Sequence, residues 1–443
     1  MNEGLTPYQV AGIRKWLGKR GFPLENLQEK TVQHALAKLD LPADVKRVLQ
    51  IRQTLASLSL TKLNALRACT GSDGRARGLY SYHGATPGRW TAHLFQPQNL
   101  PRPTVDIGTD EIEDVVAAIG TGDPEALNRW IDKEKGQGPI DVLESSLRFA
   151  LTPAEGALFG VGDFSMIETC VLLALAGQRD KCELIASGVD IYRDMAATIY
   201  GLDREAFLAT PKNELTVEQQ QQRQAGKNTI LGCGYGMGPP RFRQTYLRHL
   251  PAEEAKQFAE ETVYVHYRQN WAPRVPKLWR DLERTARRAM LQRGKTATAE
   301  CGILYKLETV AGLPCLVCTL LNGKRIHYQN ARMSPDRTDR RGYPVWTYWA
   351  YRKGQWREIE PYGGQLCENC VQALARELLV DAMFRLEARG FPVIAHCHDE
   401  ITVESPDITV EIMSEIMAER PRWAVELDVP VKVEAWTGKR YRK

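Results

Sequence analysis

Three short segments of this chain carry residue types that could catalyse the transfer of a nucleotide. They are Gly162 to Glu168 (GDFSMIE), Arg223 to Tyr235 (RQAGKNTILGCGY) and His398 to Glu400 (HDE). Asp163 and Asp399 each follow an apolar run that is typical of a strand. Arg223 and Lys227 are four residues apart, so they share one face of a predicted helix. Carboxylates bind metal ions and cationic side chains bind phosphate, so the pattern predicts a nucleotidyl-transfer site.

The chemistry explains this choice of residues. Joining a primer 3′-hydroxyl to a nucleotide α-phosphate builds negative charge on the phosphoryl oxygens, so catalysis is mainly positioning and electrostatic stabilisation. Two divalent cations roughly 3.5–4 Å apart can serve both the attacking and the leaving oxygen. Mg²⁺ usually takes one or two carboxylates and completes its shell with phosphate and water. Two aspartates from distant segments would therefore suffice.

Length and composition are compatible with an enzyme of this kind. With 443 residues, of which 43% are hydrophobic, two or three packed subdomains are expected. No apolar run approaches the roughly 18 residues of a membrane span, and the start MNEGLTPYQV lacks the apolar core of a signal peptide. The expected location is the cytoplasm. The net charge of +5 permits a nucleic-acid partner without requiring one.

The patterns of apolar residues predict a mixed α and β chain. Helical spacing is expected over the first sixty residues, over short helices from 110 to 148, over most of 190–292, and over 365–389. Strands are expected in ALFGVGDF, in several antiparallel strands over 300–360, and in a hairpin FPVIAHCHDEITVE with Asp399 at its tip. The stretch from Gly84 to Pro101 is rich in Gly, Pro and Gln and predicts an ordered loop.

Simpler structural interpretations exist for several of these residues. Ser165 and Glu168 fit a capping box at the start of the helix MIETCVLLALAG. Arg223 and Lys227, taken alone, fit surface ion pairs, and Tyr235 fits a core tyrosine.

Two cysteine pairs allow a zinc interpretation. They are Cys315 with Cys318 and Cys367 with Cys370. However, the first pair lies in a predicted strand, where positions three apart point to opposite faces, and the second lies on the apolar stripe of a predicted helix. Buried core thiols are therefore the simpler interpretation.

Four motifs in order resemble those of family A DNA polymerases, the polymerase I-like enzymes, and most of all the phage and prophage branch. The resemblance is carried by GVGDFSMIE, RQAGKNTILGCGYGMG, CHDEITVE and the segment GRWTAHLFQPQNLPRP. It implies an α+β right-hand polymerase fold with an antiparallel palm sheet, helical fingers and a partial helical thumb. The implied division is thumb 1–65, palm 66–180 and 301–443, and fingers 181–300.

The resemblance also implies roles for individual residues. Asp163, Asp399 and the Phe164 carbonyl would hold two Mg²⁺ ions, for which Mn²⁺ is an expected substitute, and Glu400 would support this site. Arg223 and Lys227 would grip the triphosphate, and Lys227 would assist catalysis. The remaining roles are nucleotide binding by Glu168 (against a ribose 2′-hydroxyl), Tyr192, Leu231 and Tyr235 (near the templating position), and DNA binding by Arg89, Gln98, Asn99, Gln372 and His398.

Two residues depart from the family pattern. Leu231 stands where the family usually has Phe or Tyr, which puts the contact to the incoming sugar in doubt. Tyr192 stands where many relatives have His, so a hydroxyl replaces a cation near the triphosphate.

The expected function is template-directed DNA synthesis without a proofreading exonuclease. Relatives carry an exonuclease domain and a complete thumb before the point where this sequence starts, so a fragment, a reduced enzyme and half of a split system all fit. A separate exonuclease, thumb or processivity protein is an expected partner beside primer-template DNA and deoxynucleotides, in a bacterial host or phage-infected cell. The alternatives are a single-subunit RNA polymerase and a catalytically idle DNA-binding subunit.

Overall fold

The computed structural model describes residues 9–38, 40–55, 58–339, 341–352 and 354–442. The chain forms two compact units. The first comprises residues 1–81, 92–155 and 438–443, and the second comprises residues 82–91 and 156–437. The short strands β1 (Tyr80–Ser81) and β2 (Thr91–Ala92) lie near the points where the chain leaves one unit for the other.

The first unit is helical. Its elements are α1 (Val10–Lys19), α2 (Glu29–Lys38), α3 (Ala43–Leu55), α4 (Leu58–Cys69), η1 (Pro97–Asn99), η2 (Thr109–Glu111), α5 (Ile112–Gly120), η3 (Pro124–Trp130), α6 (Pro139–Ser146) and η4 (Leu147–Ala150). Ile13 and Leu17 on α1 pack with Val45 and Leu49 on α3, each pair at the four-residue spacing of one helix face. The helices predicted near the N-terminus and over 110–148 are thus confirmed for the described residues.

The second unit contains a four-stranded sheet that carries the predicted carboxylates. Its strand order is β10 (Val393–Cys397), β11 (Glu400–Ser405), β3 (Leu158–Phe164) and β12 (Val433–Gly438). β11 pairs antiparallel with both β10 and β3. The predicted strand ALFGVGDF and the predicted hairpin with Asp399 at its tip are therefore confirmed.

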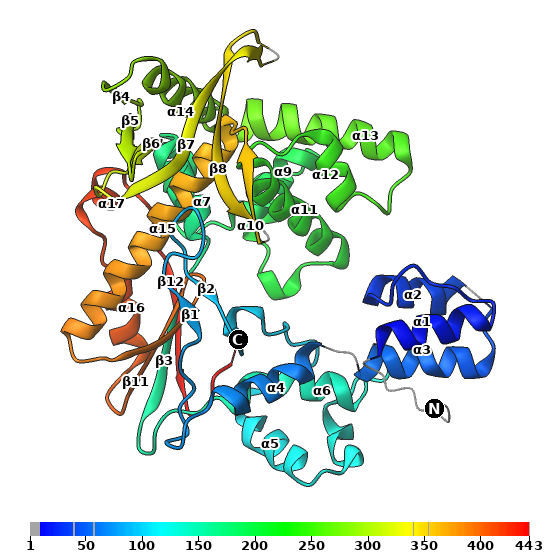
Figure 1. Cartoon of the computed structure of the whole chain (residues 1–443). Helices are drawn as coiled ribbons and strands as arrows, with labels where there is room; N and C mark the ends of the chain where they lie inside the picture. The colour runs from blue at the N-terminus through cyan, green and yellow to red at the C-terminus, as the bar shows by residue number, and fades with distance from the viewer. Residues whose placement is uncertain (1–8, 39, 56–57, 340, 353, 443) are drawn as a thin grey trace. The chain divides into compact units, whose positions relative to one another are not determined.

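Two glycines of β3 make room for a helix on one face of this sheet. A Cβ on Gly162 would lie 2.3 Å from the Met417 sulfur, and one on Gly160 would lie 2.4 Å from Ile408. Met417 belongs to α16 (Val410–Ala418), which packs on β3 (Figure 1). Since side chains alternate along a strand, α16 covers the face opposite to Asp163.

The segment between Ile167 and Leu291 is helical. Its elements are α7 (Ile167–Leu175), α8 (Arg179–Ala186), α9 (Ile191–Tyr200), α10 (Arg204–Ala209), η5 (Lys212–Glu214), α11 (Val217–Cys233), α12 (Pro239–Tyr246), α13 (Ala252–Glu260), the π-helical η6 (Glu261–Trp271) and α14 (Arg274–Leu291). This confirms the helical prediction for 190–292. Among the described residues, no helix has both the length and the apolar character needed to cross a bilayer.

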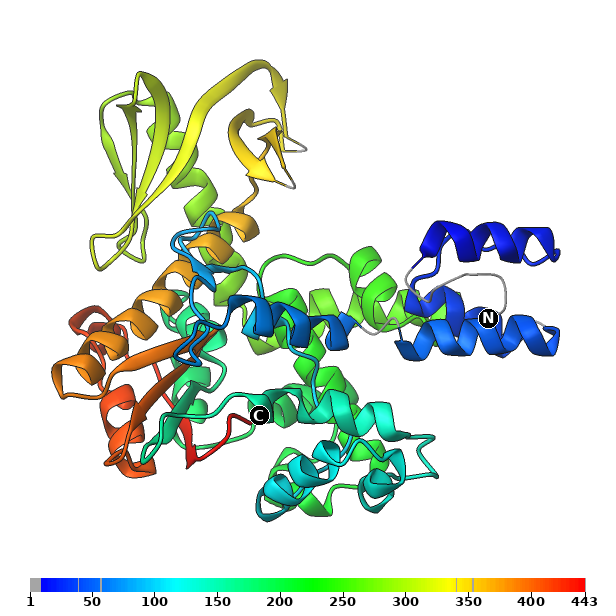
Figure 2. The ribbon, with the colours of Figure 1, turned by 60° about the horizontal axis from the view of Figure 1, so that its bottom comes forward.

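A six-stranded sheet follows, with the order β4 (Thr296–Thr298), β5 (Leu304–Val310), β6 (Leu313–Thr319), β7 (Arg325–Thr338), β8 (Pro344–Arg352) and β9 (Gln355–Ile359). Every neighbouring pair is antiparallel, as predicted for 300–360. The long helix α15 (Gly363–Ala388) comes next, drawn in orange in Figure 2, and α17 (Arg422–Glu426) precedes β12 in the sequence. Cys315, Cys318, Cys367 and Cys370 are buried free thiols, and the Cys318 and Cys370 sulfurs lie 3.8 Å apart.

Helix α11 crosses α9 at very close range because of Gly226. A Cβ at this position would lie 2.1 Å from the Tyr192 carbonyl oxygen and 3.0 Å from the Ala196 nitrogen, both backbone atoms that cannot swing away. Thr216 caps α11 through the Gln219 N–H, and the Gln219 side chain accepts from the Thr216 N–H. The close crossing brings the predicted phosphate-binding face of α11 against the start of α9.

We expect Gly226→Ala to lower the melting temperature, because the added methyl group would force the two helices apart at a cost of about 1–3 kcal/mol. Helix propensity alone predicts the opposite sign, a gain of about 1 kcal/mol. The matched control is Gly18→Ala on α1, where a Cβ would meet nothing within 4 Å. Thermal unfolding followed by circular dichroism measures both, and a stabilised Gly226→Ala protein would contradict the close crossing.

Candidate active site

The strand pairing places Asp163 and Asp399 at the same end of the four-stranded sheet. Asp163 is the penultimate residue of β3, and its register partner on β11 is Glu400. Asp399 lies in the two-residue turn that joins β10 to β11, and its carbonyl oxygen accepts from the Phe164 N–H at 3.0 Å. Phe164 and Glu400 are each 2% exposed. The two predicted metal-binding segments are therefore neighbours in space.

Left-handed backbone conformations occur beside both aspartates. His398 has φ 57° and precedes Asp399, and Met166 has φ 54° and follows Asp163 by three residues. Non-glycine residues rarely adopt this conformation, and it is found disproportionately at functional sites. Each carboxylate thus lies next to a sharp change of backbone direction that the surrounding structure imposes.

Arg89 connects two of the predicted site carboxylates. Its guanidinium forms an ion pair with Glu168 and lies 3.5 Å from an Asp399 oxygen. The Tyr235 hydroxyl donates to the other Glu168 oxygen at 3.4 Å. Burial, and then the Glu168 carboxylate, raise the pKa of Tyr235 well above its ordinary value, so this hydroxyl stays protonated as a donor. The structure thereby brings Arg89, Glu168, Tyr235 and Asp399 together.

The predicted capping box at Ser165 and Glu168 is wrong. Helix α7 begins at Ile167, and its N-cap residue is Met166, with no side-chain hydrogen bond to the cap. The Glu168 carboxylate reaches Arg89 and Tyr235 instead of the backbone at the helix start. A charged partner competes successfully here because a charge-assisted hydrogen bond is roughly twice as strong as a neutral one.

A second group of predicted residues meets where α11 crosses α9. Arg223 Nε donates to Asp190 Oδ2 at 2.6 Å, and its guanidinium carbon lies 5.2 Å from the Tyr192 ring centroid. Lys227 Nζ lies 5.7 Å from the same centroid. Burial raises the pKa of Tyr192 to about 12, although Arg223 works in the other direction. Both cations therefore lie on one neutral aromatic ring.

Sequence reasoning missed Asp190 in this group. Its position before an apolar helical run marks it as an N-cap, and it does accept from the Tyr192 and Arg193 N–H groups. Its ion pair with Arg223, 33 residues away, has no signal in the local sequence.

The remaining predicted contact residues belong to several different elements. Leu231 is 49% exposed on α11, Gln372 on α15 donates to Glu368 at 3.3 Å, and His398 lies in the turn beside Asp399. Gln98 and Asn99 belong to the other compact unit, in η1. There Asn99 donates to Gln96 at 2.7 Å, and the Gln98 side-chain oxygen is buried without a hydrogen-bond partner among the described residues.

The loop that carries Arg89 contains further residues that sequence reasoning missed. The Trp90 ring lies 4.5 Å from the His396 ring, centroid to centroid, and 4.1 Å from the Arg376 guanidinium carbon. Burial, followed by the nearby charge of Arg376, lowers the pKa of His396 to about 4. Single residues of this kind carry no motif, so only the folded chain shows that they belong together.

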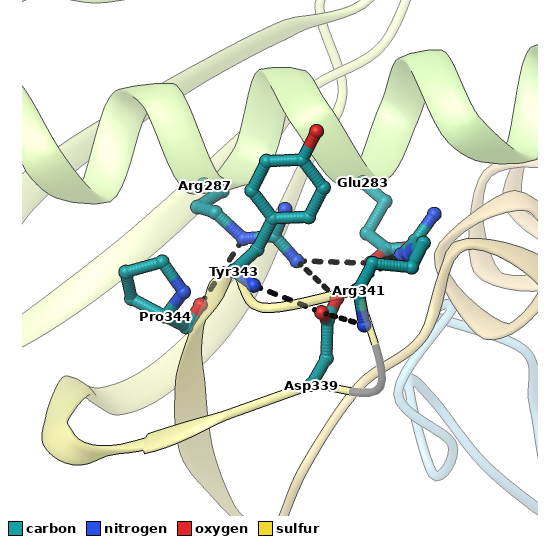
Figure 3. Close-up of polar contacts among 6 residues, drawn as sticks. All are labelled: Glu283, Arg287, Asp339, Arg341, Tyr343 and Pro344. Atoms are coloured by element: carbon teal, nitrogen blue, oxygen red, sulfur yellow. Dashed lines mark hydrogen bonds and ion pairs between the residues drawn. The ribbon is translucent and has the colours of Figure 1, made fainter.

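A polar cluster joins the end of the β7–β8 hairpin to α14 (Figure 3). Arg287 lies 3.0 Å from Glu283 and 3.2 Å from Asp339, and it donates to the Pro344 carbonyl oxygen at 3.1 Å. Asp339 accepts from the Arg341 and Tyr343 N–H groups at 2.9 and 3.0 Å. Arg341 in turn forms an ion pair with Glu283.

The end of this hairpin borders a groove of about 780 Å³. Its lining includes Gly236, which directly follows Tyr235 in the sequence, and Tyr362, Arg268, Arg280 and Arg341. Cationic and aromatic side chains together are the composition that binds single-stranded nucleic acid.

The candidate metal ligands form a small oxygen set. Among the described parts of the chain, no group of three or more His, Cys, Asp or Glu side chains is arranged to hold a metal ion. Asp163 and Asp399 with a backbone carbonyl are nevertheless compatible with Mg²⁺, which takes one or two carboxylates and leaves the rest of its shell to substrate phosphate and water.

The sequence is similar to those of known DNA polymerases. The chain is 30% identical to the DNA polymerase of Bacillus phage SP02, over 99% of this chain and 63% of that protein. It is 28% identical to the thermostable DNA polymerase I of Thermus filiformis and 26% identical to that of Thermus aquaticus, each over 67% of this chain and 28% of the relative. The chain thus spans less than two thirds of the length of these relatives. No family model matches the sequence.

A solved structure has a similar fold. The POL domain of Pol1 from M. smegmatis, in complex with a DNA primer-template and dNTP, has a TM-score of 0.59, covering 98% of this chain and 61% of that one. The sequence identity is 16%, so this likeness concerns the fold. It confirms the predicted α+β polymerase fold.

The depressed pKa of His396 makes stability depend on pH. Below about pH 6.5 an unfolded chain protonates this histidine, whereas the folded chain does so only near pH 4, so the stability present above pH 6.5 is progressively lost as the pH falls. We expect wild type to lose on the order of 1–3 kcal/mol more than His396→Gln between pH 7 and pH 4. Urea unfolding across this range measures the difference. The control is His34→Gln, at an exposed histidine, and parallel curves for wild type and His396→Gln would refute the buried neutral imidazole.

Proposed function

We propose that this chain is a family A, polymerase I-like, template-directed DNA polymerase that adds deoxynucleotides to a primer 3′ end. The observation that carries the proposal is the juxtaposition of Asp163 and Asp399 by the β3–β11 pairing. The further division into a thumb (1–65), palm (66–180 and 301–443) and fingers (181–300) is part of the same proposal. Primer extension with purified protein tests it.

The chain's own residues fit a magnesium site. In the proposed mechanism Asp163, Asp399 and the Phe164 carbonyl would hold two Mg²⁺ ions, and buried Glu400, the strand partner of Asp163, would support this site. When bound, the metal ions would lower the charge on the reacting oxygens and align the primer hydroxyl with the α-phosphate. Asp163 lies on a paired strand, and Asp399 lies in a short turn whose backbone is hydrogen-bonded to Phe164, so the backbone holds both aspartates in place.

The cations of α11 would bind the triphosphate. Arg223 and Lys227 present two positive charges from one helix face, held over the Tyr192 ring. An incoming triphosphate would replace Asp190 as the anionic partner of the Arg223 guanidinium. Lys227, which lies near the same ring, would stabilise the negative charge that develops on the phosphate as its bond to the leaving group breaks.

Glu168 would select the sugar. Its carboxylate is fixed from two sides by Arg89 and Tyr235, so it cannot easily swing aside for a ribose 2′-hydroxyl. This arrangement favours DNA synthesis over the alternative of a single-subunit RNA polymerase, which would be expected to have a small residue at that position. The Leu231 side chain is exposed, so other groups would contact the rest of the sugar.

Polar side chains would hold the primer and the template. The proposed contacts are Arg89, Gln98, Asn99, Gln372 and His398. Every base pair presents hydrogen-bond acceptors in the minor groove, so such contacts test pair shape without reading sequence. Tyr235 would lie by the templating base, and the groove beyond Gly236 would receive the unpaired template. A separate exonuclease or processivity protein is a further proposed partner.

We expect Asp163→Asn and Asp399→Asn each to reduce nucleotide incorporation by about 10²–10³-fold or more, because a neutral amide cannot replace an anionic metal ligand. Primer extension with Mg²⁺, with DNA affinity measured in parallel, provides the test. Asp407→Asn, an exposed aspartate just beyond β11, is the matched control and should extend normally. Near-normal extension by either site variant would remove the assignment.

Glu168→Ala should increase ribonucleotide incorporation relative to deoxynucleotide incorporation, because the carboxylate that would crowd the 2′-hydroxyl is gone. The stability cost should stay within about 1 kcal/mol, since only a partly exposed ion pair is lost and no cap exists to lose. Competition between the two nucleotide types, scored on denaturing gels, gives the ratio. An unchanged ratio in folded protein, equal to that of the exposed control Glu183→Ala, would argue against a sugar gate.

A further inference from the structure

The loop from Tyr82 to Thr91 presents two aromatic rings to one buried arginine. The Arg376 guanidinium carbon lies 4.1 Å from the Trp90 ring centroid and 5.3 Å from the Tyr82 ring centroid. Arg376 belongs to α15 and is only 6% exposed. Its Nε is buried without a hydrogen-bond partner among the described residues, and the two rings lie against the guanidinium as cation–π partners.

Glu377 extends this contact to the turn between β6 and β7. It accepts from Arg376 at 2.5 Å, from Lys324 Nζ at 2.6 Å and from Asn322 Nδ2 at 3.1 Å. Lys324 in turn reaches the loop, because its Nζ lies 3.0 Å from where a Cβ on Gly88 would be. One carboxylate therefore links both cations that touch the loop.

These contacts fall on the two residues that flank Arg89. Trp90 is held by Arg376, and Gly88 adjoins Lys324. Gly88 has φ +84°, and its N–H closes a turn on the Ala85 carbonyl oxygen at 2.8 Å. The backbone is thus fixed on either side of the guanidinium that pairs with Glu168 and Asp399.

We propose that Arg376 is a positioning residue for Arg89: by holding Trp90 it sets where the Arg89 guanidinium lies between Glu168 and Asp399. Arg376 would act on the Arg89 guanidinium through the loop. The effect of Arg376 on sugar selection rests on the proposed polymerase function, in which Glu168 excludes a ribose 2′-hydroxyl. The position of the loop itself does not depend on that function.

The experiment compares Arg376→Gln with wild type by two independent measurements. Hydrogen exchange, read by mass spectrometry on the peptide covering residues 82–91, reports the loop. The ratio of ribonucleotide to deoxynucleotide incorporation reports sugar selection by Glu168. Loss of a buried cation–π contact should raise both the exchange rate of this peptide and the incorporation ratio by about tenfold. Arg376→Lys, which keeps the charge, should bring both values part of the way back to those of wild type.

The matched control is Arg389→Gln, which removes an arginine at the far end of the same helix that is paired with Glu419 at 2.6 Å. It should leave both measurements unchanged. If Arg376→Gln fails to fold, Trp90→Leu removes the other side of the same contact and should give the same two increases. Melting temperatures identify the folded variants.

A second pair of variants separates positioning from general stability. In an Arg89→Ala background, Arg376→Gln should still raise loop exchange but should no longer change the incorporation ratio, because the group it positions is absent. Equal effects on the ratio in both backgrounds would overturn the proposal, as would wild-type loop exchange in a folded Arg376→Gln protein. If wild type extends no primer while Arg376→Gln loosens the loop, the proposed function fails and the positioning role stands.

Discussion

The antiparallel pairing of β3 with β11 is the constraint on which the candidate site depends. The register sets Glu400 opposite Asp163, and the Phe164 N–H bonds the Asp399 carbonyl oxygen at 3.0 Å. A slip by one residue would turn one carboxylate to the other face, because strand side chains alternate with a period of two. Gly160 and Gly162 protect this register, since only residues without a Cβ leave room for α16 on the opposite face.

Several charges of the site already have an ionic partner before any substrate arrives. Arg89 offsets Glu168 and Asp399, and Asp190 offsets Arg223. An unpaired charge in a partly buried site would cost several kcal/mol, whereas exchange of one ionic partner for another costs much less. Substrate phosphate at Arg223 can therefore bind by replacing a carboxylate, without creating a new buried charge.

The sequence predicts the elements of this fold because their signals are local. Apolar spacing gives α11 and α15, alternation gives the strands over 300–360, and the hairpin with Asp399 at its tip follows from two strands around a short turn. Partners distant in sequence leave no such signal. Arg89 and Glu168 are separated by 79 residues, and Arg376 meets Trp90 across most of the second unit's sequence. Apolar patterning predicts which face of an element is buried, but it does not predict which charged side chains form ion pairs with one another.

The one local rule that fails does so at a residue of the candidate site. A Ser and a Glu three residues apart normally cap a helix, and a cap is worth roughly 1 kcal/mol. At Glu168 the carboxylate instead serves Arg89 and Tyr235, and the helix begins after Met166 in a left-handed conformation that costs energy. The chain thus forgoes a cheap local interaction for a distant ionic one. Such a conflict between local preference and observed structure is expected where a side chain is placed for a site and not for its own helix.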